Sequence, residues 1–214
     1  MDLGYFVVGF LALIISVCIH EAAHALVANW LGDPTGKHLG RITLNPVPHI
    51  DLFYTIILPI VLLITTKGSF VFGGAKPVPV NHFNFKNPPV GMAVSAAAGP
   101  ISNFLLAILG GLILIVLVKL NIIDPLTYNF KFLVVFVMTN VTLGVFNLLP
   151  IPPLDGSRVF RLILPANIRE SFDQLERFGL FIVMGVMLLD QNNIIGTFSY
   201  NLTISLLVFM AGLL

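Results

Sequence analysis

Three stretches of the chain are apolar over the length that a helix needs to cross a lipid bilayer: residues 3–31, 91–120 and 132–149. A hydrocarbon core of about 30 Å takes about 20 such residues in a helix. The charges in these stretches are few, and the first of them holds its ionisable residues in one short cluster. Such runs predict an all-α protein that crosses the membrane several times.

Two other regions complete the expected architecture. Residues 52–66 are apolar but slightly short for a crossing and contain Pro59, so we expect a short or re-entrant helix there. Residues 178–189 and 194–214 lie on either side of a polar break and predict a C-terminal helical hairpin within 174–214. The chain is therefore expected to have about six membrane segments.

The composition fits an integral membrane protein. Charged residues make up 10% of the chain and hydrophobic ones 57%, against about 25% and 45–50% in globular proteins. The formal net charge of +1 leaves no basic face for nucleic acid, and Cys18 is the one cysteine, which excludes an intrachain disulfide. We expect a single domain over residues 1–214 in contact with the lipid bilayer; the oligomeric state is not encoded in any feature of the sequence.

The ionisable cluster in the first stretch has the sequence HEAAH, in which His20 and His24 flank Glu21. Histidines at positions i and i+4 share one face of a helix and can bind one Zn²⁺. The glutamate beside them can accept a proton from a water molecule that the metal activates. An ionisable residue at mid-bilayer costs at least about 2.5–3.5 kcal/mol on insertion scales, which favours a functional site over a satisfied polar cluster.

A catalytic zinc ion takes three protein ligands and keeps one position open, so a third ligand must come from elsewhere. Asp155 is the best candidate, because the prolines of the preceding sequence PIPP end the helix and present it on extended chain. Gly156 then allows a sharp turn. Taken alone, Asp155 would be interpreted as a loop carboxylate or a helix N-cap; the HEAAH cluster favours the ligand.

Three separated motifs resemble those of the site-2 protease family of intramembrane zinc metalloproteases: HEAAH at 20–24, GPISN at 99–103 and NLLPIPPLDG at 147–156. The resemblance covers a catalytic core of roughly residues 3–164. It implies one Zn²⁺ per chain bound by His20, His24 and Asp155, with Glu21 as the catalytic base. It also implies that Asn147 lies near the scissile peptide.

The resemblance implies an activity as well: cleavage of locally unwound transmembrane segments of membrane proteins. No PDZ-like or CBS-like domain is recognisable, so the chain resembles the compact, prokaryotic branch of the family.

Two polar connections predict a small β element near the active site. Residues 36–45 include an alternating pattern from Arg41 to Leu44 that is typical of a short strand, and residues 73–80 are expected to be extended because of their prolines. We hypothesise that an unwound substrate strand pairs with this element, with Thr43 and Val78 as substrate-binding residues. A plain surface loop is the equal alternative.

Four further polar residues have two interpretations each. Asn103 and Asn140 lie within apolar stretches, where hydrogen bonding between helices is the favoured interpretation and substrate binding the alternative. His49 and His82 flank the ambiguous region; loop histidines near the interface are favoured over a second metal site.

The ligands can meet only if Asp155 and the end of the first stretch lie on the same side of the membrane, so residues 52–80 must return to the side from which they leave. With that topology, nine of the eleven Lys and Arg residues lie on this side, and only Lys119 and Lys131 lie on the other. The positive-inside rule then predicts a multi-pass protein in a prokaryotic cell membrane, with an active site that opens toward the cytoplasm.

Two other functions use the same residues. A metal-ion transporter or channel could employ the His and Asp cluster as a transit site, but such a site needs exits on both sides, and no inverted repeat is present. An inactive scaffold would have no use for Glu21 beside the metal. An intramembrane zinc metalloendopeptidase is therefore the predicted function.

Overall fold

The computed structural model describes residues 3–65, 73–190 and 192–213. Every regular secondary-structure element within these residues is a helix. Four helices are long and apolar enough to cross a membrane: α1 (Leu3–Trp30), α4 (Pro88–Lys119), α5 (Tyr128–Asn147) and α9 (Ile194–Leu213). The three long stretches of the sequence thus form helices close to the expected bounds, which confirms the all-helical membrane class.

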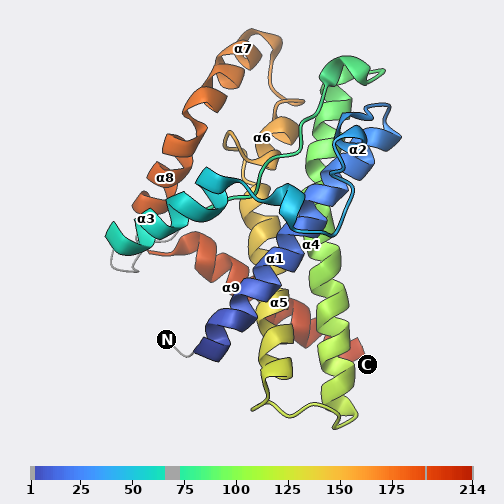
Figure 1. Cartoon of the computed structure of the whole chain (residues 1–214), viewed down its shortest axis with the longest axis vertical. Coiled ribbons are helices and arrows are strands. Elements are labelled where there is room, and N and C mark those ends of the chain that lie inside the picture. Colours follow the sequence, from blue (N-terminus) through green and yellow to red (C-terminus); the bar gives the residue numbers. More distant parts are fainter. Residues whose placement is uncertain (1–2, 66–72, 191, 214) are drawn as a thin grey trace.

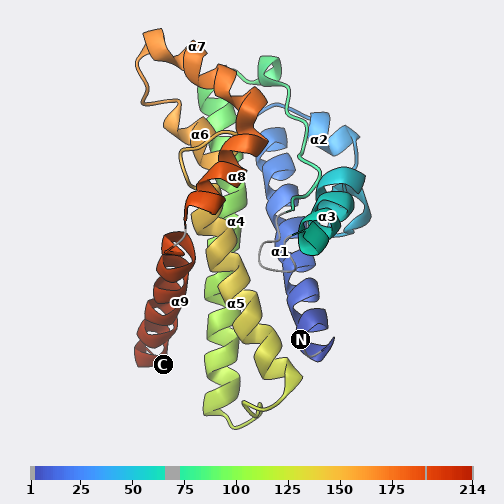
Figure 2. The same cartoon turned by 90° about the vertical axis from the view of Figure 1, so that its left-hand side faces the viewer.

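Helix α4 lies at the centre of the bundle, with α1 and α5 packed along it and α9 against α5 (Figures 1 and 2). Alanine and glycine residues of α4, among them Ala96 and Ala107, are buried at these contacts and allow the neighbouring helices to approach closely. Ala107 packs with Val137 and Val141 of α5 in the apolar core.

The short elements gather at one end of the bundle, the upper end in Figure 1. Helix α1 ends there, α4 begins there and α5 returns to it, so their connections meet. These elements include α2 (Thr35–His38), η3 (His82–Asn84), α6 (Asp155–Phe160) and α7 (Ala166–Gln174). Two further short helices, η1 (Val47–His49) and η4 (Leu175–Phe178), lie in the connections that lead away from them. The arrangement brings the end of α1 and the residues after α5 to the same end of the molecule, as the metal-site prediction requires.

The ambiguous apolar region forms a π-helical segment, η2 (Leu52–Ile57), which leads into α3 (Leu58–Thr65). The chain after this region returns to its beginning: the Gly74 N–H donates to the Tyr54 carbonyl over 3.0 Å, and the Thr55 hydroxyl donates to the Gly74 carbonyl over 2.7 Å. Entry and exit therefore lie together, which is the geometry of a re-entrant segment. This region does not add a full span to the four.

The expected C-terminal hairpin over 174–214 is not formed. Helix α8 (Gly179–Leu189) has 11 residues, about 16 Å of helix, which is too short for a crossing. Helix α9 continues away from α8, toward the end of the bundle where the N-terminus lies (Figures 1 and 2). The polar break is instead a helix cap, because the Asp190 carboxylate accepts hydrogen bonds from the N–H groups of Ile194 and Ile195. The expected six segments therefore reduce to four spans and two shorter helices.

The predicted β element is also absent from the described residues. The alternation from Arg41 to Leu44 suggested a strand, but local side-chain hydrogen bonds take over the backbone: the Thr43 hydroxyl accepts from the Asn45 N–H, and the Asn45 side chain accepts from the Val47 N–H, each over 3.1 Å. Such turns compete with strand ladders. The substrate-binding roles predicted for Thr43 and Val78 thus lose the sheet edge on which they depended.

Asp33, directly after α1, ties the connections at this end together. It is fully buried and accepts hydrogen bonds from the Asn81 N–H, the Asn84 side-chain amide, and the N–H and hydroxyl of Thr35. Burial alone would raise the pKa of Asp33, but these hydrogen bonds outweigh it and hold the pKa below its ordinary value. The ionised carboxylate is therefore part of the fold.

We expect Asp33→Asn to lower stability by about 2 kcal/mol at pH 7, because an amide cannot accept all four hydrogen bonds. A carboxyl group with a lowered folded-state pKa contributes stability above its unfolded pKa of about 3.9 and loses it as the pH falls through the folded value. The difference in thermal unfolding midpoint between wild type and Asp33→Asn, measured in detergent, should therefore shrink below about pH 4. Glu170→Gln, at an exposed carboxylate, is the control; an equal pH dependence in both variants would contradict this assignment.

Candidate metal centre

His20 and His24 lie one turn apart on the face of α1 that meets α4, and both are buried, at 7% and 8% exposure. The apolar sequence on either side of them keeps α1 helical through the cluster, so that positions i and i+4 point the same way. Their Nε2 atoms lie 3.0 Å apart. The two imidazoles thus present one nitrogen each to a common point.

The other ring nitrogens face α4 and fix the tautomers. His20 Nδ1 donates to Asn103 Oδ1 over 2.6 Å, and His24 Nδ1 donates to the Ser95 carbonyl over 2.7 Å. With the hydrogen of each neutral ring on Nδ1, both Nε2 atoms carry an unprotonated lone pair. This is the arrangement that metal-binding histidines show, with the second nitrogen donating to a neighbouring oxygen.

Asp155 completes the cluster from the first residue of α6. Its Oδ2 lies 3.2 Å from His20 Nε2 and 3.3 Å from His24 Nε2. The prolines after α5 end the helix, the Pro152–Pro153 peptide is cis, and the chain folds back closely enough that a Cβ on Gly156 would overlap the carbonyl of Leu148. Gly156 is therefore required for the turn that directs Asp155 toward α1.

The donor set fits a zinc ion. Three atoms that are all hydrogen-bond acceptors face one another, which is unfavourable unless a cation lies between them. Zinc bond lengths of about 2.0–2.1 Å in a tetrahedron place neighbouring ligand atoms about 3.3 Å apart, close to the 3.0–3.3 Å separations found here. Within the described residues, His20, His24 and Asp155 are the one group of at least three His, Cys, Asp or Glu side chains with this proximity. Their role as ligands stays a prediction.

Gly99 of α4 lies directly against the two imidazoles. A Cβ at this position would overlap His24 Nε2 and the Cε1 atoms of both rings. The backbone of α4 therefore approaches the cluster as closely as a helix can, which excludes lipid and other side chains from this side.

A buried hydrogen-bond network extends from His20 across three helices. Asn103 donates to Asn140 Oδ1 over 2.8 Å, and Asn140 donates in turn to the hydroxyl of Ser16 and the carbonyl of Phe136, each over 2.8 Å. Asn103 and Asn140 are completely buried. Hydrogen bonding between helices, the favoured interpretation of these two asparagines, is what the structure has; substrate binding by either stays a prediction.

Glu21 is half-buried beside the cluster, on the side that faces the connection after α3. Its Oε2 accepts a hydrogen bond of 3.1 Å from the Val78 N–H. Arg41 lies in the same region and is 4% exposed. Burial lowers the pKa of Arg41, and the charge of Glu21 partly offsets this effect.

The remaining predicted residues have other partners. Asn147, at the end of α5, is half-buried and donates to the Leu143 carbonyl, and Thr43 accepts a hydrogen bond at its carbonyl from His49. His49 is a buried loop histidine, and His82 is an exposed one whose ring lies tilted against that of Phe83. Neither His49 nor His82 belongs to a metal-like cluster among the described residues.

Sequence reasoning missed Ser16, Ser95 and the inward position of Arg41. A signal for the two serines was present: Ser16, His20 and His24 recur every four residues, as do Ser95, Gly99 and Asn103. When two apolar helices each carry polar or small residues at every fourth position, these residues are expected to lie where the two helices pack against each other. Arg41 gave no such signal.

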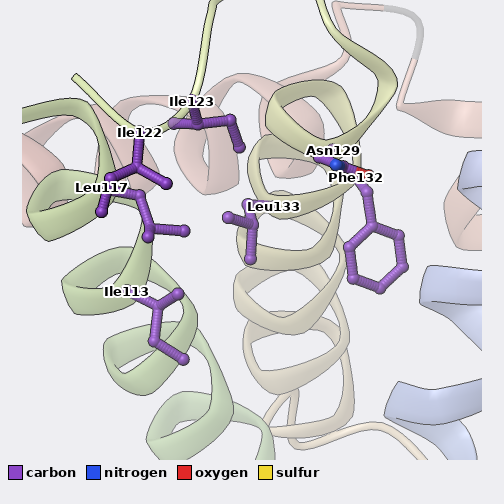
Figure 3. A pocket seen from close by; sticks show the side chains of 7 residues that line it. All are labelled: Ile113, Leu117, Ile122, Ile123, Asn129, Phe132 and Leu133. Atoms are coloured by element: carbon purple, nitrogen blue, oxygen red, sulfur yellow. The ribbon is translucent and has the colours of Figure 1, made fainter.

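The cavity in Figure 3 is not an alternative site. It has a volume of about 370 Å³ and lies between the far ends of α4 and α5, lined by residues such as Ile113, Leu117 and Leu133. Asn129 is the one polar residue of its lining, and none of its lining residues is titratable. It offers no catalytic chemistry.

Sequence comparisons relate the chain to known metalloproteases. The sequence model of peptidase family M50 matches residues 8–133 and 127–189. The chain is 38% identical over 177 residues to "Putative zinc metalloprotease YwhC" of Bacillus subtilis, a match that covers 81% of this chain and 77% of that protein. It is 29% identical over 186 residues to "Putative zinc metalloprotease Rip2" of Mycolicibacterium smegmatis, covering 86% of this chain and 68% of that protein. No solved structure matches the chain significantly.

We expect Gly99→Ala to lower zinc affinity at least about tenfold, because the added methyl group displaces both imidazoles. Gly9→Ala is the matched control on α1, since a Cβ there meets nothing within 4 Å. The measurement is zinc per chain by mass spectrometry after equilibration with a competing chelator. Full occupancy in a folded Gly99→Ala protein would show that the metal binds elsewhere.

Proposed function

Because the chain belongs to peptidase family M50 and is a membrane zinc metalloprotease, we propose that it is an intramembrane endopeptidase that cleaves locally unwound transmembrane segments of other membrane proteins. The observation that carries the proposal is the convergence of two unprotonated imidazole nitrogens and a carboxylate oxygen, with Glu21 beside them on α1. The two histidines lie six and ten residues, or roughly 9 and 15 Å of helix, before the end of a candidate span.

His20, His24 and Asp155 would hold the zinc ion, one per chain. Zinc in such a site supplies Lewis acidity, which polarises a carbonyl group and makes a water molecule more acidic. Asn103 and the Ser95 carbonyl keep the imidazoles in the orientation and tautomer that binding requires.

Glu21 would act as general base and then as general acid. One carboxylate oxygen accepts a proton from the attacking water, and the protonated group then delivers it to the leaving amine of the cleaved peptide. The peptide must be unwound before this step, because a helix hides its carbonyl groups in i to i+4 hydrogen bonds. Asn147 is proposed to lie near the scissile peptide.

Glu21→Gln should retain zinc and lose cleavage by at least about a thousandfold, because an amide cannot accept the proton. The test uses purified protein, a panel of single-span membrane proteins, and mass spectrometry of the products with and without chelator. His24→Ala is the comparison, since it should lose zinc as well as activity. Retained proteolysis in Glu21→Gln would exclude this mechanism.

We further propose that the centre opens toward the cytoplasm in a prokaryotic cell membrane. Apart from Lys67, which lies outside the described residues, the Lys and Arg residues of the expected cytoplasmic side belong to the connections and short elements between α1 and α4 and after α5. Lys119 and Lys131 flank the opposite turn between α4 and α5. An excess of positive charge marks cytoplasmic loops.

Single cysteines test this orientation in a Cys18→Ala background. His38→Cys and Glu170→Cys should react with a membrane-impermeant thiol reagent only when the cytoplasmic face is accessible, and Asp124→Cys only from the other face. All three positions are exposed. Reaction of positions 38 and 170 from different faces would contradict the common side that the metal centre needs.

A further inference from the structure

The extended segment 76–81 passes beside Glu21 and is attached at three points. The Lys76 N–H donates to the His49 carbonyl over 2.8 Å, the Val78 N–H donates to Glu21 Oε2 over 3.1 Å, and the Asn81 N–H donates to Asp33 Oδ2 over 2.8 Å. The middle attachment is the one that reaches the proposed catalytic carboxylate.

Two prolines determine which groups of this segment are available. Alternate residues of extended chain direct their backbone groups to opposite edges, so Lys76 and Val78 share one edge. Pro77 and Pro79, on the other edge, have no N–H to donate. The edge that holds Glu21 is therefore the one edge of residues 76–79 with hydrogen-bond donors.

Arg41 sets the register of this edge. Its guanidinium donates to the Lys76 carbonyl through Nη2 and to the Pro48 carbonyl through Nη1. Both backbone groups of Lys76, two residues before Val78, are therefore hydrogen-bonded: the N–H donates to the His49 carbonyl, and the carbonyl accepts from Arg41. The planar fork of arginine can hold two carbonyls in fixed directions, whereas the point charge of lysine cannot.

The burial of Arg41 restricts its guanidinium to this one arrangement of hydrogen bonds. Arg41 is 4% exposed, and its Nε has no hydrogen-bond partner among the described residues. Burying a guanidinium is costly unless its contacts are kept, so its two carbonyl partners define one position for the side chain. The side chain of Val78 is held as well: a Cβ on Gly36 of α2 would lie 3.1 Å from Val78 Cγ1.

We propose that Arg41 is a positioning residue for Glu21: by clamping Lys76 it places the Val78 N–H on one carboxylate oxygen and leaves the other to exchange the proton. The inference rests on the proposed function of Glu21 as the base. A base that is fixed in direction avoids the loss that follows from small misplacements of a catalytic group. The hydrogen bond from the Val78 N–H to Glu21 is then kept both before and during catalysis.

Substitution by proline removes one N–H at a time from this segment. Val78→Pro suits the extended backbone between Pro77 and Pro79, and it should lower kcat at least about tenfold with zinc content unchanged and KM within about threefold. Val80→Pro is the matched control, because the Val80 N–H makes no hydrogen bond within the described part of the chain; its kcat should stay within about twofold of wild type. Wild-type kcat in Val78→Pro would overturn the proposal, and so would a higher one, which would make the contact an inhibitory latch.

Arginine-to-lysine substitutions test the clamp in the same assay. Arg41→Lys should reproduce the loss of kcat seen in Val78→Pro. Arg169→Lys is the control, since Arg169 also donates to two backbone carbonyls, those of Leu162 and Leu164, after α6. Equal effects of the two substitutions would mean that Arg41 contributes only general stability, which contradicts a positioning role.

Amide hydrogen exchange supplies a readout that does not depend on activity. Because Pro77 and Pro79 lack amide hydrogens, Lys76 and Val78 are the only exchanging positions of residues 76–79. Both should be protected in wild type, Arg41→Lys should expose both, and Glu21→Ala should expose Val78 alone. Fast exchange at Val78 in wild type would overturn the inference even if the protein cleaves its substrates. Proteolysis that survives Glu21→Gln would instead overturn the proposed function, and the two failures are therefore distinguishable.

Discussion

The need to satisfy buried polar groups inside an apolar bundle determines how α1 and α4 pack. Neither lipid nor water is available to the ring hydrogens of His20 and His24, so oxygens on the neighbouring helix must accept them. Ser95 and Asn103 supply those oxygens; they lie eight residues apart on α4, with Gly99 midway between them and against both imidazoles. One register of the two antiparallel helices therefore fixes both tautomers and both lone pairs.

The rest of the molecule brings the third oxygen and the base to this pair. Helix α5 returns the chain to the end where α1 stops, and the turn at Gly156 directs Asp155 back toward the histidines. The re-entrant segment and the extended chain after it return to the same end, where Asp33 and Arg41 anchor them. Within the described residues, Glu21 is hydrogen-bonded to this part of the structure through one backbone N–H, that of Val78.

The sequence predicted the features that depend on short spacing or on length. HEAAH lies within about one helical turn, and Asp155 follows a proline-rich helix end. The three long apolar stretches have a length that only a membrane-spanning helix requires. The features that it did not predict depend on local competition or on distant partners. Thr43 and Asn45 form side-chain turns where alternation suggested a strand, and Asp190 caps α9 where a hairpin tip was expected. Arg41 was assigned only to the expected strand, because its carbonyl partner at Lys76 lies 35 positions away and leaves no sign in the local sequence.

X-ray absorption spectroscopy at the zinc edge of the purified protein tests the central claim most directly, since it reports the atoms bound to the metal. The account predicts only nitrogen and oxygen ligands at about 2.0–2.1 Å, with two imidazoles, and a spectrum in which Asp155→Ala loses an oxygen neighbour. A sulfur ligand at about 2.3 Å would point to Cys18 and contradict the account. So would an Asp155→Ala spectrum identical to that of the wild type.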